Sequence, residues 1–170
     1  MDMLETQKKA LLQFQQQQQS LVLATLDRAK TPCGSYSPFV ATDLFTYFIF
    51  VSRLAKHTEN LLHRPITSVM LLEAENAAAN IFARKRFTLT CSANFIIRNE
   101  AVWPNILDQF EQRFGSVLRV LRQLADFQLI RLQAEQGLWV TGFGQAFWVK
   151  RDPFQIGASL TADTEQSTTK

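Results

Sequence analysis

The stretch CGSYSPFVATDLFTYFIFVS, residues 33–52, decides the fold class, because it contains two predicted strands in direct succession. Residues 33–43 and 44–52 are both rich in aromatic and β-branched side chains, a composition that is typical of β-strands. Strands that follow each other without an intervening helix favour an antiparallel arrangement, since parallel strands need a long crossover.

The rest of the chain continues in the same way, with strands following one another more often than they alternate with helices. We expect further strands at 20–27, 66–75, 84–98, 126–133 and 137–149, and helices at 3–19, 52–65, 75–83 and 104–121. This order favours an antiparallel α+β barrel or sandwich over a doubly wound sheet. Neither a GxGxxG after the first strand nor a GxxxxGK[ST] occurs, so a Rossmann or P-loop nucleotide site is not supported.

Composition indicates one globular domain. The 170 residues are 46% hydrophobic, and no apolar run approaches the roughly 20 residues that span a bilayer. The N-terminus is charged and glutamine-rich, unlike a secretion signal. Cys33 and Cys91 stand far apart, which argues against a disulfide framework or a zinc site and makes a reducing cytoplasm the expected location. A net charge of +3 is weak support for nucleic-acid binding, so we expect neither a nucleic-acid nor a membrane partner.

The stretch SRLAKHTENLLHRP, residues 52–65, is the first candidate site. His57 and His63 are six residues apart, a rotation of about 240° on a helix, so they cannot bind one metal ion from a single face. The helical spacing instead predicts one polar face, which suits an anion but is equally typical of a solvated surface. That face contains Arg53, Lys56, His57, Asn60 and Arg64, and the core is expected to receive Leu54, Leu61 and Leu62.

The segment ARKRFTLT, residues 83–90, is the second candidate site. Strand alternation predicts that Phe87 faces the core, whereas Arg84 and Arg86 lie on the opposite face beside two threonines. Guanidinium and hydroxyl groups on one strand face suit a phosphate or propionate group. The alternative is an exposed edge strand protected by charge.

Two further features are ambiguous. Gly142 and Gly144 leave one strand face bare, which permits the close approach of a flat ligand or marks a β-bulge. Asp126 begins an apolar strand, where it is more often a cap than a functional group. Neither a Ser-His-Asp order nor a pair of catalytic carboxylates stands out, so redox chemistry would need a cofactor.

These segments, taken in order, resemble a known family. SLVLATLD, GSYSPFV, VSRLAKHTENLLHRP, ITSVMLLEAENAAANIFARKRFTLTC, ADFQLIRL and GFGQAF are similar to segments of the HugZ/HutZ-type heme-utilisation proteins of the pyridoxamine 5′-phosphate oxidase-like, FMN-binding split-barrel superfamily. The resemblance implies a six-stranded antiparallel Greek-key split β-barrel with short helices. Residues 1–155 would form this domain, and residues 156–170 a polar tail.

The resemblance also implies a homodimer with ligand pockets at the subunit interface. Its heme-utilisation branch binds heme and cleaves it oxidatively to release iron, with electrons from an external reductant. We therefore expect a heme-binding protein of heme-iron utilisation that resembles a heme oxygenase. The alternatives are an FMN-dependent oxidoreductase and a non-catalytic heme carrier.

Site residues follow from the same resemblance. Arg86, with Arg84 beside it, matches the arginine expected near heme or its propionates, and Asp126 matches the aspartate that supports the proximal histidine across the dimer. Arg53 and Lys56 match positions that meet the FMN phosphate in relatives. Heme-binding members supply the axial histidine from the C-terminal tail, but the tail here, GASLTADTEQSTTK, contains none. His57, which matches the histidine of the LAKHT segment, is the candidate iron ligand.

Overall fold

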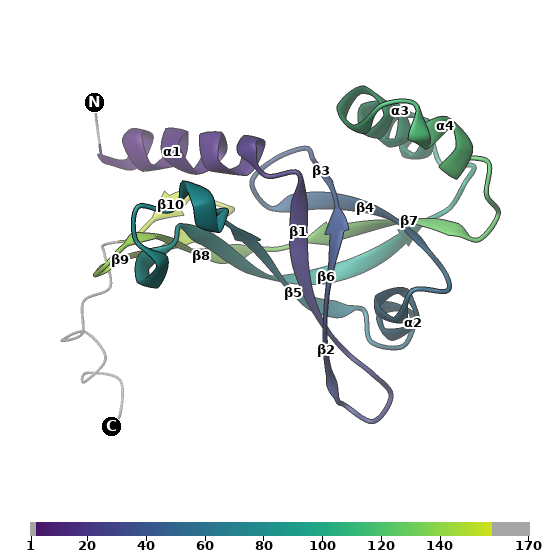
Figure 1. The fold of residues 1–170 in the computed structure, drawn as a ribbon, viewed down its shortest axis with the longest axis horizontal. Helices are drawn as coiled ribbons and strands as arrows, with labels where there is room; N and C mark the ends of the chain where they lie inside the picture. Colours follow the sequence, from purple (N-terminus) through teal and green to yellow (C-terminus); the bar gives the residue numbers. More distant parts are fainter. Residues whose placement is uncertain (1–2, 158–170) are drawn as a thin grey trace.

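One antiparallel sheet forms most of the molecule, and the computed structural model describes residues 3–157 (Figure 1). The helical elements are α1 (Met3–Gln17), α2 (Lys56–His63), η1 (Glu75–Ala77), η2 (Ile81–Ala83), α3 (Val102–Phe114) and α4 (Val117–Leu121). The strands are β1 (Ser20–Leu26), β2 (Pro32–Pro38), β3 (Val40–Ala41), β4 (Thr46–Ser52), β5 (Ile66–Leu72), β6 (Arg86–Ile96), β7 (Phe127–Gln133), β8 (Gln136–Gly142), β9 (Gln145–Lys150) and β10 (Gln155–Ile156). The expected α+β class is confirmed.

Six strands form a half-barrel in the order β2-β1-β5-β6-β7-β4, and each neighbouring pair is antiparallel. β3 pairs with β4, whereas β8, β9 and β10 extend the sheet from the first half of β6. Within residues 3–157 no ladder joins β2 to β4, so the barrel is open along that seam. This arrangement is the split barrel that the sequence led us to expect.

β7 and β8 together run alongside the whole of β6. Ser92 lies opposite Gln133 in β7, and Leu89 lies opposite Gly137 in β8. The step from Leu89 to Ser92 is three residues, but the step from Gln133 to Gly137 is four, so the β7–β8 segment contains one extra residue there. Such a bulge bends the sheet. β8 and β9 therefore leave the barrel and reach toward α1.

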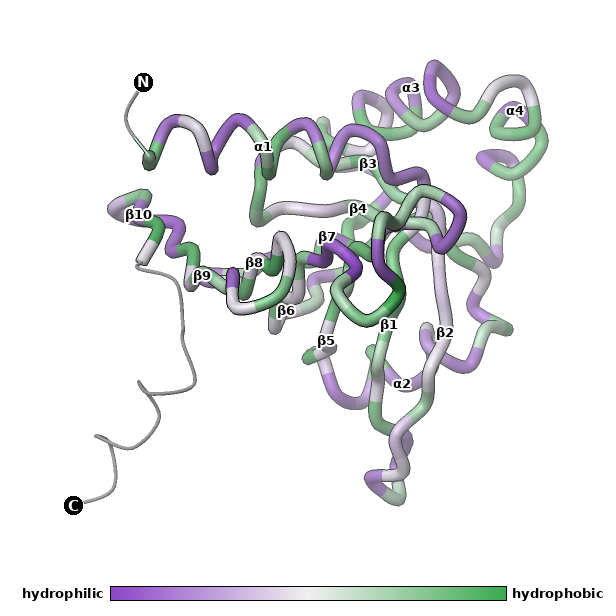
Figure 2. Tube along the Cα trace, turned by 60° about the vertical axis from the view of Figure 1, so that its left-hand side comes forward, coloured by the Kyte–Doolittle hydropathy of each residue, from purple (hydrophilic) through white to green (hydrophobic). Residues whose placement is uncertain are grey.

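The main core lies on the inner face of the sheet. Alternate residues of β1, β5 and β6 are buried there, as expected for strands with one face in the core. α1 closes the β8–β9 end and contributes Leu11 and Phe14 to this core. Figure 2 shows hydrophobic segments of α1 turned toward the sheet and hydrophilic segments turned away from it.

A second core lies on the outer face at the opposite end. There α3 and α4 cover β4 and β7, with Phe50 packed against Trp103 and Phe110. The outer face over β2, β1, β5, β6, β8 and β9 has no such covering helix in the described part of the chain (Figure 1).

Four predicted elements are divided in the structure. The predicted helix 75–83 consists of two separate 3₁₀ turns, η1 and η2. The predicted strand 33–43 is interrupted at Phe39, between β2 and β3. The predicted helix 104–121 breaks at Gly115, whose φ of 83° ends α3 before α4 begins. The predicted strand 137–149 is a hairpin, because Gly144 adopts a φ of 64° in the turn between β8 and β9. Gly142 lies at a register shift between β8 and β9, which agrees with the bulge interpretation.

The domain boundaries stay a prediction. The last pairing observed is that of β10 with β9, which includes Ile156 and so extends one residue beyond the expected domain of 1–155. Of the expected polar tail, residues 158–170 lie outside the described residues, as do residues 1 and 2.

Candidate functional site

The end of β4 brings Asp126 next to Arg53. The β4–β7 ladder places Ser52 opposite Phe127, so the residues on either side of that pair meet. The backbone N–H of Arg53 donates to the carbonyl oxygen of Asp126 at 2.8 Å. Ser52 Oγ donates to Asp126 Oδ2 at 2.7 Å. Asp126 is half-buried, and this hydroxyl fixes the direction of its carboxylate.

α2 begins later than the sequence predicted, and this changes which side chains share its polar face. Since Arg53 is tied to Asp126, the helix starts only at Lys56, and Leu54 is left 90% exposed. Leu62 is also exposed, whereas Leu61 enters the core as expected. Asn60 is buried and donates to Thr25 Oγ1 at 2.9 Å. The predictions for Leu54, Leu62 and Asn60 are therefore wrong.

His57 lies in the first turn of α2, half-buried against the inner side of β2. Its Nδ1 is 3.1 Å from Ser35 Oγ. Its Nε2 is shielded from solvent and has no hydrogen-bond partner within residues 3–157. Burial lowers the pKa of His57, because the charged imidazolium loses its hydration there. The imidazole is therefore held neutral, which is the form that ligates iron.

Lys56 is exposed at the start of α2 and forms an ion pair with Glu59, with Nζ 3.0 Å from Oε2. The hydrogen bond that Lys56 donates to Glu59 raises the pKa of Lys56. By contrast, the Arg53 side chain makes no hydrogen bond or ion pair within residues 3–157. Of the two cations expected to meet a phosphate, only Arg53 keeps its charge uncompensated.

Arg84 and Arg86 have different roles. Arg84 precedes β6 and braces the loop after β5, where its Nε donates to the carbonyl oxygen of Glu73 at 2.9 Å. Arg86 begins β6, is half-buried on the outer face, and donates from Nη1 to the carbonyl oxygen of Arg84 at 3.1 Å. Because β6 pairs with β5 on one side and with β8 on the other, Arg86 is not on an edge strand. The edge-protection alternative is therefore excluded.

The predicted site residues fall into two groups at opposite ends of β6. Arg86 is its first residue, whereas its last residue, Ile96, lies opposite Leu129, near Asp126. Eleven strand residues span about 34 Å. Within one protomer the structure therefore joins Arg53, Lys56, His57 and Asp126 at one end, and leaves Arg84 and Arg86 at the other.

A row of mostly apolar side chains crosses the uncovered outer face beside Arg86. Consecutive ladder pairs define this outer row as Tyr36, Val22, Met70, Thr88, Leu138 and Trp148. Tyr36 is 70% exposed and Trp148 is 43% exposed. In the next row, Arg86 stands between Leu72 and Val140. Exposed apolar surface of this kind marks a binding or interaction face.

Sequence reasoning missed the partners of the predicted site residues. Ser35 contacts His57 from 22 positions away, and Ser52 contacts Asp126 from 74 positions away. Arg131, also missed, lies on β7 with a buried Nε that has no hydrogen-bond partner in the described part of the chain. No local pattern marks these residues, because strand pairing between distant segments brings them into place.

Two other expectations can be compared with the structure. Within residues 3–157, no group of three His, Cys, Asp or Glu side chains could hold a metal ion. Among the helices in the same range, none is both long enough and apolar enough to span a membrane.

Known proteins share both the sequence and the fold. The family described as pyridoxamine 5′-phosphate oxidase matches residues 7–140. The heme oxygenase HutZ of Vibrio cholerae is 43% identical over 140 residues, which cover 82% of this chain and 79% of HutZ. A crystal structure of HutZ, described as the heme storage protein of that organism, matches with a TM-score of 0.73 and 40% identity, over 78% of this chain and 93% of that one.

ChuZ from Campylobacter jejuni matches with a TM-score of 0.83 and 30% identity, over 94% of this chain but only 64% of ChuZ. A heme-binding protein from Mycobacterium smegmatis shares the fold, with a TM-score of 0.73 at 20% identity. From the matched family, the identity to HutZ and the split barrel, it follows that this chain belongs to the pyridoxamine 5′-phosphate oxidase family and, within it, to the HutZ-type proteins.

Proposed function

We propose that this protein binds heme on the outer sheet face of a homodimer and takes part in recovering iron from heme. The observation that carries this proposal is the 43% identity to a heme oxygenase over 82% of the chain. Two free cysteines, Cys33 and Cys91, fit a reducing cytoplasm as its location.

The chemistry of the outer face suits heme. The macrocycle is flat and apolar, and the outer row offers aliphatic and aromatic side chains, among them Met70 and Leu138, across several strands. Its propionates need cations, and the Arg86 guanidinium lies in the adjacent row with only one hydrogen bond to the backbone. Flat apolar surface next to an available cation is the combination that an amphipathic porphyrin requires.

A homodimer would complete the site. Arg86 and Asp126 are at opposite ends of β6 in one chain, so a single protomer cannot present both to one ligand. Two-fold pairing of the outer faces would supply both residues from two chains, and such isologous contacts are the commonest in homodimers. The uncovered apolar row supports this arrangement.

Each residue would have a definite task. Arg86 would hold a propionate, and Asp126, oriented by Ser52, would direct an iron ligand or a water molecule. His57 is the proposed iron ligand, since its Nε2 is unpartnered and its imidazole is neutral. Because Nε2 is shielded on the inner side of β2, across the sheet from the outer row, ligation would require the start of α2 to move around β2 to the heme face. Bound heme would supply the redox chemistry, with electrons from an external reductant.

Titration of the heme-free protein with hemin tests this proposal. We expect a saturable Soret change, and Arg86→Ala should bind hemin about 10- to 100-fold more weakly, because it loses a charge-assisted hydrogen bond. Arg119→Ala, at a 72% exposed side chain on α4, is the matched control and should bind like the wild type. Equal affinity of the Arg86 variant, or no Soret change at all, would reject the proposal.

The oxygenase and carrier alternatives are separated by turnover. If the heme complex consumes heme under O₂ and a reductant, the protein is an enzyme like the heme oxygenase it resembles. If the Soret band persists, this protein is a heme storage protein, which is how HutZ is described in its crystal structure.

A flavin alternative is favoured by one observation, the Arg53 side chain, which is unpaired within residues 3–157 and precedes α2, in a family described as pyridoxamine 5′-phosphate oxidase. The fluorescence of FMN should then be quenched on binding to the wild type, and Arg53→Ala should abolish this quenching. Unchanged FMN fluorescence with the wild type would remove this alternative.

A further inference from the structure

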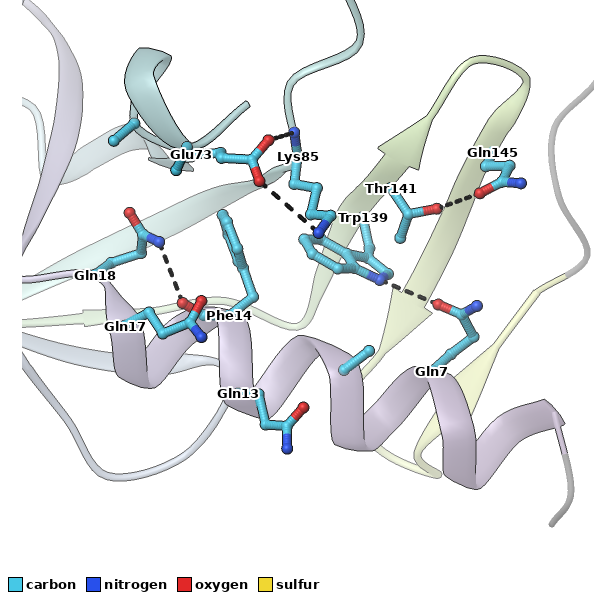
Figure 3. Close-up of a pocket in the computed structure, with 13 residues that line it drawn as sticks. Gln7, Gln13, Phe14, Gln17, Gln18, Glu73, Lys85, Trp139, Thr141 and Gln145 are labelled. Atoms are coloured by element: carbon cyan, nitrogen blue, oxygen red, sulfur yellow. Dashed lines mark hydrogen bonds and ion pairs between the residues drawn. The ribbon is translucent and has the colours of Figure 1, made fainter. Parts of the chain in front are cut away.

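A cleft separate from the proposed heme face lies beneath α1. It has a volume of about 510 Å³ and is enclosed by α1, the end of β5, η1 and the β8–β9 hairpin (Figure 3). This volume is within the usual range for small-molecule sites. Trp139 lines it and belongs to the inner core of the sheet, whereas Arg86 faces outward. The cleft and the outer row are therefore on opposite sides of the sheet.

The helix face over this cleft departs from the usual pattern. A helix that packs on a sheet normally has apolar residues at three- and four-residue steps along the facing side. Here the positions that line the cleft include Gln7, Ala10, Gln13 and Gln17, with Phe14 between them. Amides in place of core side chains leave space that Ala10, together with Ala77 opposite, does not fill. Such local departures from packing rules are concentrated at functional sites.

The hydrogen-bonding groups around the cleft are only partly used. Gln7 accepts from Trp139 Nε1 at 3.3 Å, which leaves its NH₂ group free to donate. Gln18 donates to the carbonyl oxygen of Phe14 at 3.3 Å, which leaves its amide oxygen free to accept. The side chains of Gln13 and Gln17 make no hydrogen bond within residues 3–157. The cleft thus offers both donors and acceptors, each on planar amides.

The charge of the cleft is balanced. Glu73 and Lys85 are its two charged residues, and they pair with each other: Lys85 Nζ is 3.8 Å from Glu73 Oε1, and the Lys85 N–H donates to Glu73 Oε2 at 3.1 Å (Figure 3). A ligand with a phosphate or two carboxylates would find no uncompensated cation there. An uncharged ligand needs no such cation and could bind.

We propose that this cleft binds a small, uncharged, planar heterocycle with amide or amidine edges, of the nucleobase class. Glutamine amides match such edges by pairing one donor and one acceptor, as they do when proteins read adenine. Phe14 and Trp139, which pack against each other and are 5% and 1% exposed, would form the apolar back wall behind the amides. This site does not depend on heme binding.

The indole N–H of Trp139 is a direct reporter, because it points into the cleft toward Gln7. The ¹⁵N-labelled, heme-free full chain would be titrated with adenosine and with uridine up to about 10 mM. This concentration is well above the dissociation constant expected for so small a ligand. The three indole signals are assigned with Trp103→Phe and Trp148→Phe. We expect a saturable shift of the Trp139 signal with at least one nucleoside, while the other two stay in place.

Variants decide whether the shift reports the cleft. Gln17→Ala should weaken binding about fivefold, since it removes one ligand hydrogen bond, whereas the adjacent Gln16→Ala, outside the cleft, should not. Ala77→Leu, at an exposed position on the cleft wall, should block it. An unmoved Trp139 signal with both nucleosides, or wild-type binding by a folded Ala77→Leu protein, would overturn the proposal. Hemin affinity should be unchanged in Ala77→Leu, which separates this result from the fate of the heme proposal.

Discussion

A single buried imidazole gives the protein a measurable dependence on pH. Burial holds the pKa of His57 below its unfolded value of about 6.5, so the unfolded chain takes up this proton first as the pH falls. The contribution of His57 to stability is complete above about pH 6.5 and is lost as the pH falls toward its folded-state pKa. We expect urea unfolding to show a smaller loss of stability between about pH 7.5 and 5.5 in His57→Asn than in the wild type.

Asparagine is the suitable replacement because its amide can still reach Ser35 Oγ, the partner of Nδ1, but does not titrate. His63→Asn is the control, since that histidine is exposed on the same helix. If His57→Asn keeps the full wild-type slope, the imidazole is not held neutral by burial.

At the level of elements, the bulge between β7 and β8 places a glycine where no side chain fits. A Cβ on Gly137 would lie 2.7 Å from Phe87 Cζ and 3.0 Å from the carbonyl oxygen of Thr88. Phe87 is fully buried and cannot move aside without disturbing the core. We expect Gly137→Ala to lower the free energy of unfolding by about 1–3 kcal/mol, measured by chemical denaturation.

Gly34→Ala is the matched control for this substitution. It is also a strand glycine, but on β2 at the end of the sheet path, and its added Cβ would meet nothing within 4 Å. Its effect should stay within about 0.5 kcal/mol. An equal loss of unfolding free energy in Gly137→Ala and Gly34→Ala would mean that strand propensity, rather than the contact with Phe87, governs the effect at Gly137.

The same elements show how far sequence reasoning reaches. Runs of aromatic and β-branched residues predicted the main strands, because that signal is local. Breaks were missed where one glycine adopts a positive φ, as at Gly115 and Gly144, since apolar periodicity continues across them. The pairing of β6 with β8 and β7 was also beyond prediction, because ladder partners 33 or more positions apart leave no local pattern.

For the candidate site, the sequence identified side chains but not their surroundings. Arg86 was correctly placed on the face opposite Phe87, since alternation in a strand is local. Its distance from Asp126 along β6 was not foreseeable, because it depends on the register of three strands. Burial of His57 against β2 was missed for the same reason.

At the scale of the whole molecule, residues 3–157 leave one apolar sheet face uncovered, and this predicts its assembly. Met70 lies in the middle of the outer row, half-buried, with Val22 on one side and Thr88 on the other. If two such faces meet on a two-fold axis, a charge at this position is desolvated in both chains. Met70→Glu should therefore convert a dimer, of twice the 19.4 kDa chain mass, into a monomer in sedimentation equilibrium.

Val120→Glu provides the comparison, because Val120 is also apolar and 64% exposed but lies on α4, away from the outer row. The Val120→Glu variant should remain dimeric.

The substitution at Met70 leaves the inner core untouched, since its side chain faces outward. Met70→Glu monomers should therefore unfold cooperatively and keep the wild-type circular dichroism spectrum. If heme needs Arg86 from one chain and Asp126 from the other, the Met70→Glu monomer must also lose hemin affinity although both residues are intact. A dimeric Met70→Glu protein, or a monomer with full hemin affinity, would show that the outer row does not build the heme site from two chains.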